Sequence, residues 1–126
     1  MQERTASFQR INPHGEVEGD CGYIILTLIP TGNGNGTIQI DFIALDPAGT
    51  IDGLGFTGFW RNGWTNFGTF SDADFQCDPP GNRIMSCTYN FSPGTGSVFA
   101  MLDFGTATVD GSTCFDLPVS DQQDFT

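Results

Sequence analysis

Apolar residues recur at every second position in several short segments of this chain, and this alternation most constrains its fold. In residues 37–44 the apolar positions are Ile38, Ile40, Phe42 and Ala44. The same spacing occurs in residues 83–91 and 97–104. Successive side chains of a β-strand point to opposite faces of the sheet, so this spacing predicts strands with one buried face. No segment has the apolar spacing of an amphipathic helix over a useful length.

Turn signals separate these segments. Asn62-Gly63 and Asp110-Gly111 are two-residue hairpin signals, because these residues tolerate the positive φ angles of a type I′ turn. Residues 23–29 are apolar at nearly every position and predict a central strand covered on both faces. Together the segments predict an all-β fold, an antiparallel β-sandwich or jelly roll of about eight strands, with a flattened β-barrel as the alternative.

The length of the chain fits one domain. We expect a single β-sandwich domain over residues 1–126, with a frayed polar tail at residues 120–126. We expect the chain to carry no signal peptide and Met1 to be an initiator methionine on an already processed chain.

Four cysteines indicate an oxidising compartment. None forms a C-x-x-C motif, and the chain has one histidine, so the ligands of a zinc site are missing. Three pairings of four cysteines are possible. We favour Cys77–Cys87, because Asp-Pro-Pro-Gly-Asn between them is turn chemistry that brings the flanks together. The remaining pair is then Cys21–Cys114, and the two disulfides predict a secreted or extracellular protein.

The charge balance excludes several classes of partner. The chain has 15 acidic residues, 4 arginines and no lysine, for a net charge of −11. Such a chain repels phosphate backbones and anionic lipids, so we expect no nucleic-acid partner. No window approaches 18 apolar residues, which predicts no membrane insertion. The acids serve solubility, or some of them hold calcium.

Seven aromatic residues crowd into residues 56–75, including both tryptophans of the chain. A two-residue turn at Asn62-Gly63 would place Arg61 opposite Trp64 and sort the side chains by face. Phe56, Trp60 and Phe67 would then face the core, and Phe70 would face outward. The outer face would also carry a predicted carbohydrate site made of Phe59, Arg61, Trp64 and Asn66. The alternative is that a loop or a partner subunit covers this face.

Three aspartates form a candidate calcium site in the loop after this hairpin. Asp72, Asp74 and Asp78 lie within seven positions of one another, and loop carboxylates are common calcium ligands. The alternative is that they are solvated turn acids. We expect no other cofactor.

Catalytic signals are few. His14 is the one histidine and no nucleophile motif is present. Asp41 and Asp103 are the candidates for the paired carboxylates of a glycoside hydrolase. The sequence therefore favours an extracellular, non-catalytic binding module, carbohydrate-binding or lectin-like, whose partner is a glycan or extracellular polymer. The alternatives are a structural or adhesive subunit that binds copies of itself in a filament, coat or capsid, and a small glycoside hydrolase.

Overall fold

A computed structural model of the chain describes residues 2–11, 17–46, 48–109, 111–116 and 119–126. Most of these residues lie in strands, and the one helical segment among them is a turn of 3-10 helix, so the all-β prediction is confirmed. Ten strands are present among them, against about eight expected. The elements are β1 (Gln2–Ile11), β2 (Val17–Gly32), β3 (Asn35–Ala44), β4 (Ile51–Asn62), β5 (Asn66–Ser71), η1 (Asp72–Asp74), β6 (Gln76–Cys77), β7 (Ile84–Phe91), β8 (Gly96–Val109), β9 (Ser112–Asp116) and β10 (Val119–Phe125).

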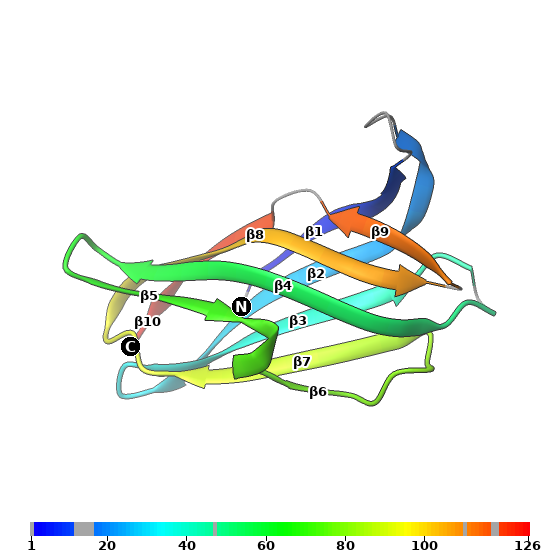
Figure 1. Cartoon of the computed structure of the whole chain (residues 1–126). Helices are drawn as coiled ribbons and strands as arrows, with labels where there is room; N and C mark the ends of the chain where they lie inside the picture. Colours follow the sequence, from blue (N-terminus) through cyan, green and yellow to red (C-terminus); the bar gives the residue numbers. More distant parts are fainter. Residues whose placement is uncertain (1, 12–16, 47, 110, 117–118) are drawn as a thin grey trace.

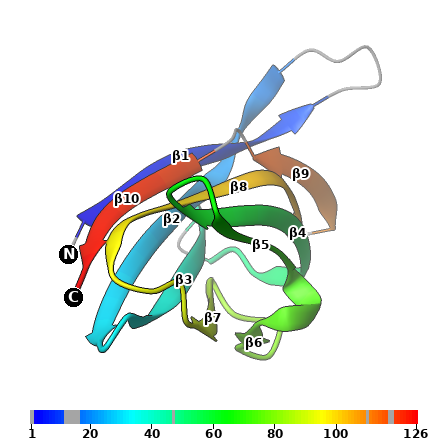
Figure 2. The same ribbon diagram turned by 90° about the vertical axis from the view of Figure 1, so that its left-hand side faces the viewer.

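The strands form two packed antiparallel layers, as a β-sandwich requires (Figure 1). Hydrogen bonds connect them in the order β5-β4-β8-β9-β1-β2-β3-β7-β6. One layer holds β1, β2, β3, β7 and β6, and the other holds β5, β4, β8 and β10. Strand β9 joins the layers, because it pairs with β8 on one side and with β1 on the other. Strand β10 pairs with the first half of β8 and lies beside β1 (Figure 2).

The core lies between the inner faces of the two layers. The predicted alternation is confirmed in β3, whose apolar side chains at every second position are fully buried. In β2 only one face is fully buried: Ile24, Leu26 and Leu28 have no more than 1% exposure, whereas Tyr23 is 42% exposed. The expectation of full cover on both faces of residues 23–29 is therefore wrong, because the second layer packs against one face only.

A β-bulge in β8 changes which residues face the core. Thr57 pairs with Phe104 and Gly58 pairs with Leu102, which leaves Asp103 as the extra residue. Before the bulge the buried positions are even-numbered, as at Leu102, and after it they are odd-numbered, as at Ala107. A bulge inserts one extra residue, which reverses the face to which the following side chains point, so a single alternation cannot describe all of β8.

Both predicted disulfides are present, Cys21–Cys114 and Cys77–Cys87. Cys21 is the extra residue of a bulge in β2, between the pairs Phe8–Gly22 and Gln9–Asp20. The bulge allows its buried sulfur to reach Cys114 on β9. Two disulfides indicate an oxidising, extracellular environment. No helix among the described residues is long and apolar enough to cross a membrane.

The tail at residues 120–126 is not frayed: it is most of strand β10. Val119, Asp121 and Phe125 point inward and are buried. The ring of Phe125 lies against Gly36 of β3, and the carboxylate of Asp121 accepts a hydrogen bond from the backbone N–H of Leu28, 3.2 Å away. The tail is mostly polar by composition, but its inward positions are filled by residues that bind the opposite layer.

Candidate functional site

The hairpin of β4 and β5 has a different register from the one that the sequence predicted. Its turn has three residues, 63–65, and Asn62 pairs with Asn66 across it. Arg61 then pairs with Phe67 instead of Trp64. The partner of Arg61 is thus shifted by three residues, and a shift by an odd number of residues moves every side chain of β5 to the other face. Phe70 is therefore buried and Phe67 is 71% exposed, the reverse of the expectation.

Packing inside the sandwich explains the observed register. Phe70 completes an aromatic cluster, with its ring 6.4 Å from that of Phe56 and 5.3 Å from that of Phe75. Gly68 lies opposite Trp60, and a Cβ at this position would come within 2.7 Å of the indole nitrogen. Because glycine has no side chain, the indole can lie flat across β5 on the inner side.

The turn is also fastened to a neighbouring loop. The side-chain amides of Asn62 and Asn66 both donate to the carbonyl oxygen of Pro93, and the first of these hydrogen bonds is 2.9 Å long. Asn62 also donates to the carbonyl oxygen of Thr95 at 2.9 Å. Pro93 is buried. The two amides thus hold the loop between β7 and β8 against the hairpin, and the three-residue turn places them on the same side.

The outer face of the hairpin joins that of β8 in one surface, which we call the aromatic platform. Its rings belong to Phe59 of β4, Trp64 of the turn, Phe67 of β5 and Phe99 of β8. The Trp64 side chain is 90% exposed. The rings of Phe59 and Phe99 lie 5.9 Å apart across the β4–β8 pairing.

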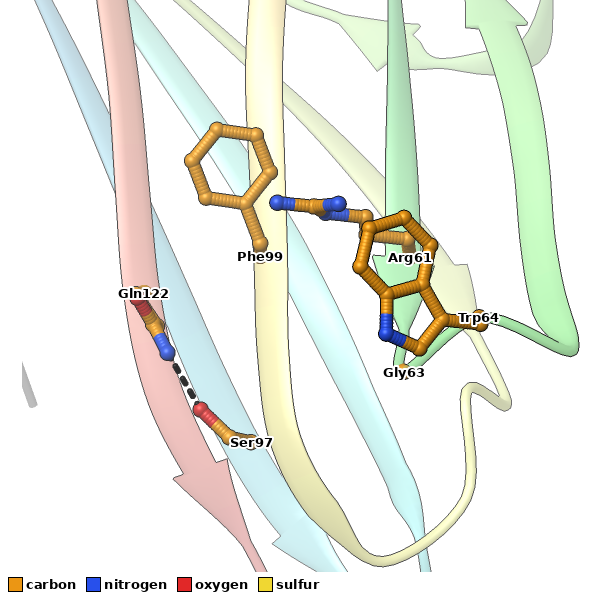
Figure 3. Close-up of a pocket in the computed structure, with 6 residues that line it drawn as sticks. All are labelled: Arg61, Gly63, Trp64, Ser97, Phe99 and Gln122. Carbon is orange, nitrogen blue, oxygen red and sulfur yellow. Dashed lines mark hydrogen bonds between the residues drawn. The ribbon is translucent and has the colours of Figure 1, made fainter.

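Arg61 lies at the centre of the platform. Its guanidinium carbon is 5.1 Å from the centre of the Phe99 ring and 5.5 Å from that of Trp64 (Figure 3). Such cation–π contacts contribute about 0.5–1 kcal/mol each at exposed sites. The guanidinium makes no hydrogen bond or ion pair with any residue that the structure describes. The Arg61 guanidinium therefore lies between two rings, and no described residue accepts a hydrogen bond from its N–H groups, so a ligand can do so.

Two depressions flank this arginine. The smaller one, about 220 Å³, is bounded by Arg61, Trp64 and Phe99 together with Ser97 and Gln122 (Figure 3). The side-chain amide of Gln122 donates to the hydroxyl oxygen of Ser97.

The larger depression, about 490 Å³, lies on the other side of Arg61. Its further lining comes from Phe59, Phe67, Thr69 and Asp103. Arg61, Gly63 and Trp64 line both depressions, so a ligand longer than one ring can contact both.

Three of the four predicted ligand-binding residues come together here. Phe59, Arg61 and Trp64 lie on the platform, whereas Asn66 lies on the other side of β5 and holds Pro93. Sequence reasoning missed Phe67, because the expected register of the hairpin differs from the observed one by three residues, an odd number. It also missed Phe99, Ser97 and Gln122, although the alternation in residues 97–104 already put Phe99 on an outer face. The missing information was the pairing of β4 with β8 and of β8 with β10.

The three loop aspartates do not come together as the predicted calcium site. The carboxylate of Asp72 accepts from the N–H of Phe56 at 3.1 Å. That of Asp74 accepts from Ser71 at 2.9 Å, and that of Asp78 from Ser86 at 3.1 Å. Within the described part of the chain, no group of three or more acidic, histidine or cysteine side chains could hold a metal ion. The carboxylates stabilise backbone N–H groups at three separate places.

Asp41 and Asp103 cannot act as the predicted carboxylate pair. Asp41 lies on the outer face of β3 and accepts hydrogen bonds from Gln39, and Asp103 lies on the outer face of β8. The two strands belong to different layers, and packed sheets stand about 10 Å apart even between their backbones. Two outward-facing carboxylates are farther apart than the 5–9.5 Å of a glycosidase pair. His14 lies outside the described residues.

The chemistry of the platform suits the binding of a ring-shaped, hydroxyl-bearing ligand. It offers flat apolar surfaces and, beside them, a guanidinium, a hydroxyl and an amide. An apolar patch rimmed by polar groups commonly marks a binding site. Comparison with known protein families, with curated proteins and with solved structures finds no match for this chain.

Proposed function

We propose that the protein is a secreted, non-catalytic module that binds carbohydrate through the aromatic platform. The observation that carries this proposal is the placement of Arg61 between the Trp64 and Phe99 rings, with a depression on either side. A sugar ring has apolar C–H faces and hydroxyl edges. Its faces would stack on Trp64 and Phe67, and its hydroxyls would accept hydrogen bonds from Arg61.

The exposure of the rings supports this use. An indole that is 90% exposed contributes little to the stability of the fold, since substitutions at such positions change the free energy of unfolding by less than about 0.5 kcal/mol. Aromatic side chains also lose little conformational entropy on binding, because they have only two side-chain torsions. Trp64 is thus better explained as a ligand contact than as a structural residue.

A glycan array tests the proposal. The wild type should bind at least one class of glycan, and Trp64→Ala should reduce that binding at least tenfold without a change in thermal stability. Tyr23→Ala is the matched control, because Tyr23 is an exposed aromatic residue of β2, in the other layer. If Trp64→Ala leaves every glycan interaction unchanged while the fold stays intact, the proposal is wrong.

A structural or adhesive subunit that binds copies of itself is the second candidate. The observation in its favour is that Trp64 and Phe67, both large and apolar, are mostly exposed on one face. A stable interface buries about 800 Å² on each partner, and rings of this kind are common at its centre. Light scattering with size exclusion distinguishes the two: a monomer supports glycan binding, and an oligomer that Trp64→Ala dissociates supports self-association.

A further inference from the structure

We infer that the smaller depression recognises the carboxylate of an acidic sugar, a uronic acid residue within an otherwise neutral glycan. This inference rests on the proposed function and names its ligand class. The depression contains the Arg61 guanidinium, which has no hydrogen-bond or ion-pair partner in the described part of the chain, the Ser97 hydroxyl and the Gln122 amide. None of its six lining residues is acidic. Asp103, by contrast, lines only the larger depression.

The hydrogen-bond partners of the described arginines favour an anionic ligand at Arg61. Arg61 and Arg83 are the two arginine side chains that the structure describes, and Arg83 donates through Nε to the carbonyl oxygen of Ala44 at 3.0 Å. For Arg61 no such partner is present among the residues that the structure describes. A guanidinium that is held between two rings and has no described acceptor for its N–H groups can pair with an acceptor on a ligand, and an anion is the strongest such acceptor.

The rings leave the guanidinium edge available. Trp64 and Phe99 stand on either side of it, as Figure 3 shows, and they orient a planar group that would otherwise move freely. A guanidinium binds a carboxylate through two parallel N–H···O bonds along its edge. The Ser97 hydroxyl already accepts a hydrogen bond from Gln122, so its own proton can be donated to the same carboxylate.

The net charge limits the kind of acidic glycan. At physiological ionic strength charges more than about 8 Å apart are largely screened. The distant acidic residues would therefore weaken an ion pair between Arg61 and a ligand carboxylate only slightly. A polymer with an acid on every sugar would still bring many charges close to an acidic protein. We therefore expect one uronic acid flanked by neutral sugars, whose neighbouring ring occupies the larger depression against Phe67.

Calorimetric titration with three matched oligosaccharides tests this inference. The first carries one glucuronic acid, the second is its methyl ester, and the third has glucose in the same place. The wild type should bind the acid at least tenfold more tightly than either neutral probe, as expected for hydrogen bonds to a charged group. Arg61→Gln should bring this ratio close to one. Arg83→Gln removes the same charge elsewhere and should leave the ratio unchanged.

The outcomes separate the two proposals. Equal binding of the acid and both neutral probes by the wild type would overturn the uronic acid inference and leave carbohydrate binding in place. Binding of none of the three probes, together with an empty glycan array, would contradict both. The comparison of the acid with its ester needs no variant, so it decides the matter even if Arg61→Gln fails to fold. Ser97→Ala, a milder change, should lower the ratio about threefold or more by removing one donor.

Discussion

The guanidinium carbon of Arg61 lies 5.5 Å from the centre of the Trp64 ring, and this contact joins the end of β4 to the turn that follows it. The ring is otherwise almost fully exposed. Because the turn has three residues, Trp64 lies above the end of the strand and does not pair with Arg61 across the hairpin. The register of this hairpin therefore determines which of its side chains lie in the core and which lie on the platform.

The hairpin register makes Phe70 a core residue and Phe67 a surface residue. We expect Phe70→Ala to reduce the free energy of unfolding by about 3–5 kcal/mol, as for other buried phenylalanines. Phe67→Ala should change it by less than about 0.5 kcal/mol. Urea denaturation of both variants measures the difference. A larger loss for Phe67→Ala would mean that the two-residue turn is the correct one.

The two amides on the Pro93 carbonyl should act together. Asn62→Ala or Asn66→Ala alone leaves the buried carbonyl oxygen with one donor. The double variant leaves it with neither, and an unsatisfied buried group costs about 1–3 kcal/mol. We therefore expect the double variant to lose more stability than the sum of the single variants. Strict additivity in a double-mutant cycle would show that the two amides do not share this acceptor.

The long disulfide should stabilise the fold more than the short one. Cys21 and Cys114 are 93 residues apart, and Cys77 and Cys87 are 10 apart. The chain-entropy relation gives about 4.6 kcal/mol for the first loop and about 2.7 kcal/mol for the second. Denaturation of Cys21→Ser/Cys114→Ser and Cys77→Ser/Cys87→Ser compares them. Equal losses would indicate that the reduced chain keeps its ends together.

The polar tail should be essential for folding. Phe125 is 2% exposed, and its ring lies 5.7 Å from that of Phe91 in the opposite layer. We expect Phe125→Ala to cost about 3–5 kcal/mol in the free energy of unfolding, measured by thermal and urea denaturation. Gln122→Ala, on the outward face of the same strand, is the control for stability. A fully stable Phe125→Ala variant would mean that the tail frays.

The fold class could be predicted from the alternation of apolar residues and from the turn residues, because both depend only on the local geometry of a short segment. The disulfide pairing followed from the turn between Cys77 and Cys87. The platform could be predicted only in part. Whether Asn62-Gly63 forms a two- or three-residue turn depends on the carbonyl of Pro93, which is distant in the sequence. The platform also depends on the pairing of β4 with β8, a strand that begins only at Gly96. Neither contact can be predicted from the residues of the hairpin itself.

A contact between a glycan and Trp64 can be observed directly, because the chain contains only one other indole, Trp60, on the inner side of the hairpin. We would titrate the glucuronic acid oligosaccharide into ¹⁵N-labelled protein and follow the two indole N–H signals by NMR, with Trp64→Phe to assign them. We expect the Trp64 signal to shift in a saturable manner while the Trp60 signal moves little. A titration in which the Trp64 signal does not move, with this oligosaccharide or with any glycan that the array retains, would contradict the proposed contact.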